Sequence, residues 1–401
     1  AIAVVCEQLP KLTESNATYI LVENSSEALG VLASNFFDNP SKKLKLIGVT
    51  GTNGKTTTVT LLYNLFKQLG YYVGLISTVC NRIQNKEIPS THTTPDAIQL
   101  NSLLNMMVNE GCEYCFMEVS SHSIVQHRIS GIYFSGGIFT NITHDHLDFH
   151  KTFSEYIKAK KMFFDNLPQQ SFALTNIDDK NGMVMLQNTK AAKYTYGLKN
   201  IADFNCKILE NELGGLLLSI DGNELSTRLV GEFNAYNLLA VYSAAVLLGQ
   251  EKISVLKELS NLGAAEGRFD YIQSKDNITA IVDYAHTPDA LLNVLRTIET
   301  IRTKNEKLIT VIGAGGNRDA QKRPVMGKVA AENSDIVIFT SDNPRNEDPN
   351  EILKQINEGV DISLKNKVLT IENRKEAMPL IWQEHKQIVS GLTESFLDGF
   401  L

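Results

Sequence analysis

From residue 44 onward, short apolar runs alternate with helical patterns, and this alternation constrains the fold more than any other feature. The runs are apolar at nearly every position, as in "LKLIGVT", "YYVGLIST", "YCFMEVS", "GGIFTNI" and "FALTNID". Between them, residues 56–69 and 98–108 have helical spacing, and Gly70 is placed to end the first helix. Continuous apolar strands separated by helices are typical of a parallel sheet covered on both faces. We therefore predict an α/β fold with a mostly parallel sheet.

A second alternating series follows a change of pattern. The segment "GGLLLSIDGNELSTRLV" predicts a hairpin that turns at Asp221 and Gly222, and "NAYNLLAVYSAAVLLG" predicts an apolar helix. New strands are then predicted in "ITAIVDYAH", "KLITVIGAG" and "DIVIFTSDNPR", with helices between and after them. A chain of 401 residues is expected to form two or three domains. We place a short segment at 1–43, a central domain at 44–266 and a smaller Rossmann-like α/β domain at 267–401.

The segment "GVTGTNGKTTT" joins a predicted strand to a predicted helix and is typical of a phosphate-binding loop. The first N–H groups of a helix lack internal partners, and the helix dipole is positive there, so anions bind at this end. Gly51 and Gly54 allow the backbone to approach phosphates closely. Lys55 can reach terminal phosphate oxygens, and the Thr56 hydroxyl can ligate Mg²⁺. The alternative is an ordinary strand–turn–helix with an exposed lysine.

The loop departs from the strict pattern G-x-x-x-x-G-K-[ST] at one position. Val49 stands where the first glycine should be. We expect Gly48, one residue earlier, to offset this loss in part, in a loop that is one residue longer than the strict pattern.

Carboxylates and histidines follow two predicted strands. Glu118 ends the strand in "MEVSSHSIVQHR", and ligands in open α/β sheets bind at that edge. The next strand is followed by "TNITHDHLDFH", which holds His144, Asp145, His146, Asp148 and His150. One histidine together with Glu118 and Thr56 would suit Mg²⁺ or Mn²⁺ better than zinc. For most of the five residues, the alternative is a solvated loop with capping aspartates.

The segment "YIKAKKMFF" predicts a helix with several lysines, which normally form a solvated face. Helical spacing puts Tyr156, Lys160 and Phe163 or Phe164 on one side, which allows Lys160 to point inward. A buried lysine either loses its charge or is modified. Composition leaves both possibilities open.

Charge and composition indicate which cellular compartment and which classes of partner to expect. A net charge of −7 argues against nucleic acid binding. The chain has no run of about 18 apolar residues that could span a bilayer, and no signal peptide at its start. The 5 cysteines form no disulfide framework. We expect a cytoplasmic protein without nucleic acid or membrane partners.

Taken together, these segments resemble the Mur ligases, a family of ATP-dependent amino-acid ligases of peptidoglycan precursor synthesis. The similarity is strongest to the branch that adds the third amino acid, and it rests on segments in the family's order. They are "GVTGTNGKTT", "THTTPD", "MEVSSHSIVQHR", "TNITHDHLDFH", "YIKAK", "GEFNAYNLLA", "GRFDYI", "DYAHTPDAL", "GAGGNRDAQKRPVMG" and "TSDNPRNEDP".

The resemblance implies an activity. The γ-phosphoryl group of ATP would pass to the D-Glu side-chain carboxylate of UDP-MurNAc-L-Ala-D-Glu, and meso-diaminopimelate would attack the acyl phosphate. Mg²⁺ would be the cofactor, and the enzyme would be a monomer. Residues 44–266 would bind ATP and 267–401 the amino acid, the latter domain incomplete. Residues 1–43 would be the remnant of an N-terminal UDP-binding domain.

The resemblance also implies roles for individual residues. Catalysis would depend on Lys55, Glu118, His146 and Lys160. ATP would contact Gly51, Thr52, Asn53, Gly54, Lys55, Thr56, Thr57, Asn237, Arg268 and Asp283. Metal ions would contact Thr56, Glu118, His146 and Lys160, the lysine once carbamylated. The UDP-MurNAc-dipeptide would contact Thr93, Thr94, Ser120, Gln126 and Arg128. The incoming amino acid would contact Arg318, Asp342, Asn343, Pro344 and Arg345.

The motif "DNPR" suggests which amino acid is added, because relatives that add diaminopimelate carry it and lysine-adding relatives usually lack its arginine. Arg345 could grip the distal carboxylate of diaminopimelate as a bidentate fork. Asn317 departs mildly from the family's aspartate in "GGNRD".

Two larger departures leave alternatives open. The N-terminal domain is represented only by its last part. The family's "AGKGHE" loop is not found, and only "QEHKQIVSGLTESFLDGF", interpreted as a shortened remnant, follows "IENRKEAMPLIW". One alternative is therefore a partial or decayed Mur ligase that binds ATP without ligating. Another is a ligase like folylpolyglutamate synthase, against which "EVSSHSIVQHR" and "DNPR" discriminate.

Overall fold

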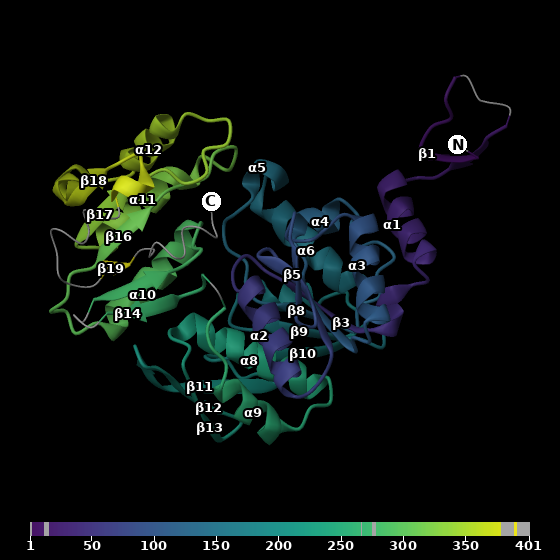
Figure 1. The fold of residues 1–401 in the computed structure, drawn as a ribbon, viewed down its shortest axis with the longest axis horizontal. Helices are drawn as coiled ribbons and strands as arrows, with labels where there is room; N and C mark the ends of the chain where they lie inside the picture. The colour runs from purple at the N-terminus through teal and green to yellow at the C-terminus, as the bar shows by residue number, and fades with distance from the viewer. Residues whose placement is uncertain (1, 12–15, 266, 275–277, 378–388, 391–401) are drawn as a thin grey trace.

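The structure is a computed structural model that describes residues 2–11, 16–265, 267–274, 278–377 and 389–390. Its strands form an 11-stranded sheet, a 6-stranded sheet and a 2-stranded sheet. Figure 1 shows the smaller α/β unit beside the larger one, with β1 (Ala3–Cys6) projecting from the body near the N-terminus. None of the helices in the described part of the chain is both long and apolar enough to cross a membrane.

The large sheet has the order β13-β12-β11-β10-β9-β8-β3-β7-β4-β5-β6. Its centre is parallel, as predicted, and comprises β3 (Lys45–Thr50), β4 (Val73–Ile76), β7 (Tyr114–Glu118), β8 (Gly136–Phe139), β9 (Phe172–Asn176), β10 (Ala192–Gly197) and β11 (Phe204–Glu212). Its antiparallel edges are β5 (Cys80–Ile83), β6 (Lys86–Pro89), β12 (Gly215–Ile220) and β13 (Asn223–Thr227). The predicted α/β fold with a mostly parallel sheet is confirmed.

The hairpin predicted between β12 and β13 turns where expected. Asp221 and Gly222 have φ values of +49° and +82°. A two-residue turn with positive φ at both central residues has a backbone twist that matches the twist of the paired strands.

Helices cover the large sheet. They are α2 (Lys55–Gln68), α3 (Ala97–Asn109), α6 (Phe153–Asp165), α8 (Glu232–Leu247) and α9 (Lys252–Ser260), with shorter α4 (Ser121–Val125), α5 (Leu147–His150) and α7 (Gly182–Met185). Helix α2 begins one residue before the predicted start, and Gly70 follows it with φ +93°. The apolar helix α8 is buried along most of its length, against α2 and the sheet. This packing fixes the helix that follows the phosphate loop.

The smaller sheet has the order β14-β15-β19-β16-β17-β18, and it is parallel except at β14–β15. Its strands are β14 (Asp270–Gln273), β15 (Thr279–Val282), β16 (Ile309–Ile312), β17 (Ile336–Phe339), β18 (Val368–Thr370) and β19 (Val389–Ser390). Its helices are α10 (Pro288–Ile301), α11 (Lys322–Asn333), α12 (Pro349–Glu358) and the 3₁₀ helix η2 (Ile362–Lys367). Apart from β19, the segment compared with "AGKGHE" lies outside the described residues.

The N-terminal segment contains β1, β2 (Thr18–Leu21), α1 (Ser25–Phe36) and the 3₁₀ helix η1 (Pro40–Lys43). Strands β1 and β2 pair in parallel as the 2-stranded sheet. Helix α1 packs on α3, which connects this segment to the large sheet.

Candidate active site

The phosphate loop lies between the end of β3 and the start of α2, and two glycines determine its shape. Gly54 is the N-cap of α2 with φ +84°, a conformation that glycine adopts without strain. A Cβ added there would lie 2.6 Å from Oδ1 of Asn237 in α8. A Cβ on Gly51 would collide with the Thr140 hydroxyl. The loop backbone is thus held tightly, and Asn237 lies beside it.

Gly48, however, does not belong to this loop. It lies within β3, where an added Cβ would come 2.6 Å from Cζ of Phe163 and 2.9 Å from Cε1 of Phe134. The expectation that Gly48 offsets the glycine missing at Val49 is therefore wrong. Glycine is needed at position 48 because the rings of Phe163 in α6 and of Phe134 pack directly on the strand.

We expect Gly48→Ala to lower the free energy of unfolding by about 1–3 kcal/mol, because the extra methyl overpacks the core. The KM for ATP should be unchanged. Urea denaturation and ATP kinetics measure the two effects. Gly214→Ala is the control, because a Cβ there meets no atom within 4 Å. Unchanged stability with weaker ATP binding would contradict the packing role.

Lys55 and Lys160 share one carbonyl group of the loop. Lys55 Nζ donates to Gly51 O and Thr52 O, each at 2.9 Å. Lys160 Nζ donates to the same Gly51 O at 2.8 Å and lies 4.6 Å from the centre of the Tyr156 ring. Lys160 is 1% exposed, so its inward orientation matches the one that helical spacing allows.

Burial determines the charge of these two lysines. It lowers the pKa of Lys160 well below its usual value, and the positive charge of Lys55 adds to this effect. Burial also lowers the pKa of Lys55, although Glu118 and Asp145 oppose it. The position of Lys160 therefore favours a neutral amine.

Glu118 is the last residue of β7 and is 1% exposed. Its Oε1 accepts the Thr56 hydroxyl at 2.9 Å and the Thr78 N–H at 2.7 Å. Arg268 of the smaller unit donates from Nη2 to Thr56 Oγ1 at 3.0 Å. The two α/β units therefore meet at the first turn of α2.

Asp283 lies next to this contact. Its Oδ2 accepts the Phe269 N–H at 2.8 Å, directly after Arg268 in the chain. Burial raises the pKa of Asp283, and the charge of Arg268 opposes that shift. The structure thus brings Arg268 to the phosphate loop and holds Asp283 beside the arginine.

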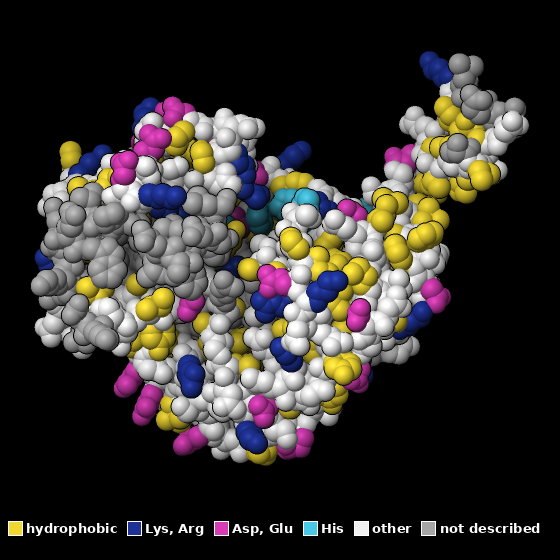
Figure 2. Space-filling model, viewed as in Figure 1, with side chains coloured by type: hydrophobic (Ala, Val, Ile, Leu, Met, Phe, Trp, Pro, Cys, Tyr) yellow, Lys and Arg dark blue, Asp and Glu magenta, His cyan; other side chains and the backbone are white. Residues whose placement is uncertain are grey.

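Histidines gather where the two units meet, as Figure 2 shows. His146 is the N-cap of α5, and its Nε2 lies 3.4 Å from Asp145 Oδ2. Its ring centre lies 5.0 Å from that of His122. Burial lowers the pKa of His146 to about 3, although Asp145 opposes the shift. His146 is therefore a neutral imidazole, the form that can ligate a metal.

The alternative of a solvated loop, expected for most of the five residues, holds for only two of them, because Asp145 and His150 are buried and His146 is half-buried. His144 and Asp148 are exposed. His150 is buried, and its Nε2 lies 2.8 Å from Ser121 Oγ.

The oxygen atoms near the loop fit a magnesium ion. The Thr56 hydroxyl and the Glu118 carboxylate, 2.9 Å apart, are hard ligands of the kind that Mg²⁺ prefers. Among the described residues, no three His, Cys, Asp or Glu side chains come close enough to form a ready-made metal cluster. A site here would therefore need ligands from bound phosphate or from a modified Lys160.

Residues predicted for the UDP-MurNAc-dipeptide surround the end of β7. Thr94 Oγ1 donates to Glu118 O at 2.8 Å and accepts the Ser120 N–H at 3.1 Å. Arg128 Nη1 donates to Thr94 O at 2.9 Å. Thr93 Oγ1 accepts from the Thr78 hydroxyl at 3.1 Å. Of the five predicted residues, the remaining one, Gln126, is exposed at the C-cap of α4.

Residues predicted for the incoming amino acid lie on two loops of the smaller unit. Arg318 is exposed on the loop before α11. Burial lowers the pKa of His122 in the larger unit, and the charge of Arg318 adds to this effect. The other loop follows β17 and contains Asp342, Asn343, Pro344 and Arg345. Arg345 Nη1 donates to the carbonyl of Gly316, so its guanidinium contacts the first loop.

Several contacts between the units involve residues that the sequence analysis did not single out. Asp145 Oδ1 lies 3.8 Å from Nζ of Lys322, and its Oδ2 lies 4.0 Å from Nε2 of His286. Asn53 Nδ2 donates to Asp289 Oδ2 at 3.2 Å. The partners in the smaller unit lie in the segments "DYAHTPD" and "QKRP". Only the folded structure brings them to Asn53 of the phosphate loop and to Asp145.

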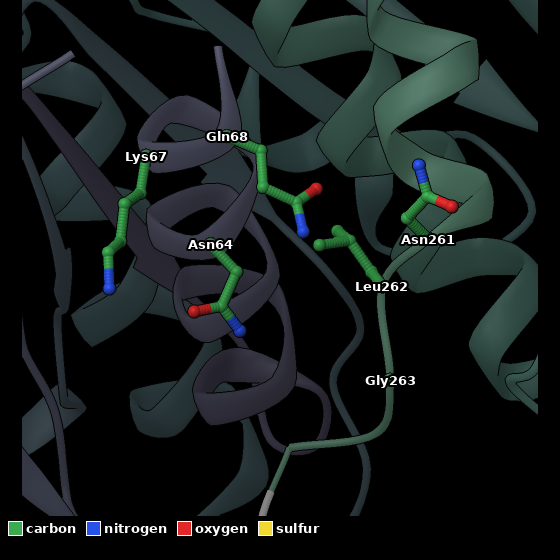
Figure 3. Close-up of a pocket in the computed structure, with 6 residues that line it drawn as sticks. All are labelled: Asn64, Lys67, Gln68, Asn261, Leu262 and Gly263. Atoms are coloured by element: carbon green, nitrogen blue, oxygen red, sulfur yellow. The ribbon is translucent and has the colours of Figure 1, made fainter. Parts of the chain in front are cut away.

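A separate hollow lies along the C-terminal half of α2. It is lined by Asn64, Lys67, Gln68, Asn261, Leu262 and Gly263, which come from α2 and the segment after α9 (Figure 3). The phosphate loop precedes the other end of α2, so this hollow is not part of the candidate site.

Comparison with known proteins identifies the family. A Mur ligase middle domain matches residues 49–245, and a Mur ligase glutamate ligase domain matches residues 267–388. A UDP-N-acetylmuramoyl-L-alanyl-D-glutamate--2,6-diaminopimelate ligase of Cytophaga hutchinsonii is 61% identical over 379 residues, which are 94% of this chain and 78% of the relative. The ligase of the same name from Bacteroides fragilis is 57% identical over 378 residues, with the same shares.

Comparison with solved structures leads to the same family. A structure described as UDP-N-acetylmuramoyl-L-alanyl-D-glutamate--2,6-diaminopimelate ligase is 30% identical, with a TM-score of 0.70, and the match covers 97% of this chain and 80% of that one. A folylpolyglutamate synthase of Mycobacterium tuberculosis has a TM-score of 0.73 over 92% of both chains, but at 17% identity it shares the fold alone. This chain belongs to the Mur ligase family.

Proposed function

We propose that this chain is an ATP-dependent ligase that joins meso-diaminopimelate to the D-Glu side-chain carboxylate of UDP-MurNAc-L-Ala-D-Glu, in peptidoglycan precursor synthesis. The observation that carries the proposal is the 61% identity, over 94% of the chain, with a protein that bears the name of that ligase. In this proposal residues 44–266 bind ATP, 267–401 bind the amino acid, and 1–43 belong to the part that holds the uridine nucleotide.

The phosphate loop would bind the triphosphate of ATP through the N–H groups at the start of α2. Lys55 now donates to Gly51 O and Thr52 O, and it would turn from these carbonyls to the γ-phosphate. Thr56 and Glu118 would hold Mg²⁺, which when bound offsets the negative charge on the transferring phosphoryl group. Asn237 and Arg268 would complete the nucleotide site from α8 and from the smaller unit.

Lys160 would act in carbamylated form. Its neutral amine can attack the carbon of CO₂ with its lone pair and lose a proton, which gives a carbamate with a negative charge. Such a group explains why a lysine is buried next to Lys55, since an anion there would pair with the ammonium group. Together with His146 it would supply ligands for a second metal ion.

The chemistry then proceeds in two steps. An oxygen of the D-Glu side-chain carboxylate attacks the γ-phosphorus of ATP, and ADP leaves. The amine of diaminopimelate attacks the acyl carbon and loses a proton, and phosphate leaves with the oxygen that came from the carboxylate. The contacts Arg268–Thr56 and Asn53–Asp289 bring the two units together, which would keep water from hydrolysing the acyl phosphate.

Arg345 would select the amino acid, because its fork can bind a distal carboxylate that lysine lacks. We expect Arg345→Ala to lower kcat/KM for meso-diaminopimelate on the order of 100-fold, as expected when a bidentate clamp that orients the substrate is lost. The KM for ATP should stay unchanged, and L-lysine should be used equally poorly by both proteins. Steady-state kinetics with each amino acid make the comparison. Unchanged kinetics with diaminopimelate would contradict this role.

The proposed function is tested by incubating the purified chain with ATP, Mg²⁺, UDP-MurNAc-L-Ala-D-Glu and meso-diaminopimelate. Mass spectrometry should find the UDP-MurNAc-tripeptide, with one phosphate released per product. ATP hydrolysis without tripeptide would instead support a Mur ligase that binds ATP without ligating. Tripeptide formation only with L-lysine would contradict the assigned amino acid.

A further inference from the structure

An ion pair between a buried arginine and a half-buried glutamate lies behind the two loops that carry Arg318 and Arg345. Arg323, in the first turn of α11, is 1% exposed. Its Nη1 donates to Oε2 of Glu347 at 2.8 Å, and its Nη2 donates to Oε1 at 2.9 Å. This is the parallel two-bond arrangement in which an arginine fixes both the position and the angle of a carboxylate.

The pair connects both loops at once. Glu347 lies two residues after Arg345, and its Oε1 also accepts the N–H of Asn317, which directly precedes Arg318. Arg323 Nη2 in turn donates to the Gly315 carbonyl at 3.2 Å. One buried guanidinium and one carboxylate therefore hold the backbone of the first loop next to Arg318, and Glu347 joins it to the loop that carries Arg345.

Direct hydrogen bonds also join the two loops. Gly316 N donates to Asn343 O at 2.9 Å, and Asn346 N donates to Oδ1 of Asn317 at 3.1 Å. Asn317 and Arg345 both have left-handed backbones, with φ values of +51° and +49°. A non-glycine residue keeps such a conformation when its surroundings hold it there, and the cross-loop bonds do so.

Neither member of the pair is free to act on a substrate. Arg323 is buried, and its guanidinium contacts Glu347, the Gly315 carbonyl and Oε1 of Gln355 on α12, the last at 2.7 Å. Hydrogen bonds from Arg323 and from the Asn317 N–H lower the pKa of Glu347 to about 2, so the carboxylate stays ionised. The pair thus has a structural role, in which it stabilises the arrangement of the two loops.

We infer that Arg323 and Glu347 are positioning residues for the amino-acid substrate, which set the distance between the guanidinium groups of Arg318 and Arg345. The inference rests on the proposed function, since it assigns those two arginines to the incoming amino acid. It adds a role for two residues that make no contact with the substrate themselves.

The test is Glu347→Gln, which keeps the size of the side chain but removes its charge and one of its acceptors. We expect kcat/KM for meso-diaminopimelate to fall on the order of 100-fold, mainly through KM, because substrate groups displaced by about 1 Å lose that much. The KM values for ATP and for the UDP-MurNAc-dipeptide should be unchanged. The preference for diaminopimelate over L-lysine should also fall.

Asp335→Asn is the matched control. Asp335 lies in the same unit and accepts from Arg302 Nη1 and from the Leu308 N–H, each at 2.8 Å, so it too joins an arginine to a backbone N–H. This variant should lose a comparable amount of thermal stability, without a change in any KM or in the preference between amino acids.

The outcomes separate the inference from the proposed function. If the parent chain forms no tripeptide, the proposed function fails and the inference falls with it. If the parent ligates and Glu347→Gln keeps its KM for diaminopimelate, the inference alone is overturned. Should Glu347→Gln not fold, Gln355→Leu removes a milder contact of Arg323. A raised KM for diaminopimelate in that variant supports the inference, and an unchanged KM overturns it.

Discussion

Replacing Lys160 with alanine is expected to lower kcat for tripeptide formation on the order of 1,000-fold, because the anionic ligand for the second metal ion would be lost, and a bound metal ion supplies several kcal/mol of charge stabilisation to the transition state. The side chain is buried, donates to Gly51 O at 2.8 Å and lies beside the ammonium group of Lys55. Continuous assay of phosphate release, with mass detection of the product, measures the loss.

Two controls make this result specific to a carbamate. Lys158→Ala removes an exposed lysine of the same helix, whose Nζ pairs with Glu155 at 2.7 Å, and should leave kcat unchanged. The parent chain should lose activity in buffer freed of CO₂ and regain it when bicarbonate is added, whereas Lys160→Ala should respond to neither change. A Lys160→Ala protein with nearly normal kcat would contradict the proposed role.

Replacing Lys55 with alanine is expected to have the second large effect, on the rate of phosphoryl transfer. We expect phosphoryl transfer to slow on the order of 1,000-fold, because a positive charge aimed at the γ-phosphate stabilises its transition state. The loop itself should remain folded, since the Asn53 N–H still donates to Asn141 Oδ1 at 2.9 Å and Gly54 still caps α2. Single-turnover kinetics with labelled ATP separates the transfer step from nucleotide binding.

Lys67→Ala serves as the matched control for Lys55. Lys67 lies near the other end of the same helix, is exposed and lines the hollow of Figure 3. Its loss should leave both ATP binding and phosphoryl transfer unchanged. Equal rates in Lys55→Ala and Lys67→Ala would remove the phosphate loop from the proposed mechanism.

Local pattern was sufficient to predict much of this fold. The run in β3 and the helical spacing of α2 predicted the frame of the phosphate loop to within one residue at each end of the helix. Asp221 and Gly222 predicted a turn because few residue pairs adopt positive φ so readily. Helical spacing allowed the inward orientation of Lys160, since Tyr156 and Phe163 share its face.

Strands with weaker patterns escaped prediction. In β11 only some positions are buried, and the run "FNCKILENE" mixes charged with apolar residues. The hairpin of β5 and β6 has strands of 4 residues each, too short for a periodicity to show.

Contacts distant in sequence escaped prediction for a different reason. Gly48 was assigned to the loop because the rings that require a glycine there come from α6 and from Phe134, far along the chain. The sequence analysis gave no role to Arg323 or Glu347, because only folding buries the arginine against its partner. Arg268 reaches Thr56 across 212 residues. Such contacts exist only once the two units have come together.

The central claim is that a D-Glu carboxylate is activated as an acyl phosphate at the loop and then captured by diaminopimelate. It is tested most directly with UDP-MurNAc-L-Ala-D-Glu labelled with ¹⁸O in the D-Glu side-chain carboxylate. The account predicts that the phosphate released during tripeptide formation carries one ¹⁸O atom from that carboxylate. Unlabelled phosphate released along with tripeptide, or phosphate released without any tripeptide, would contradict it.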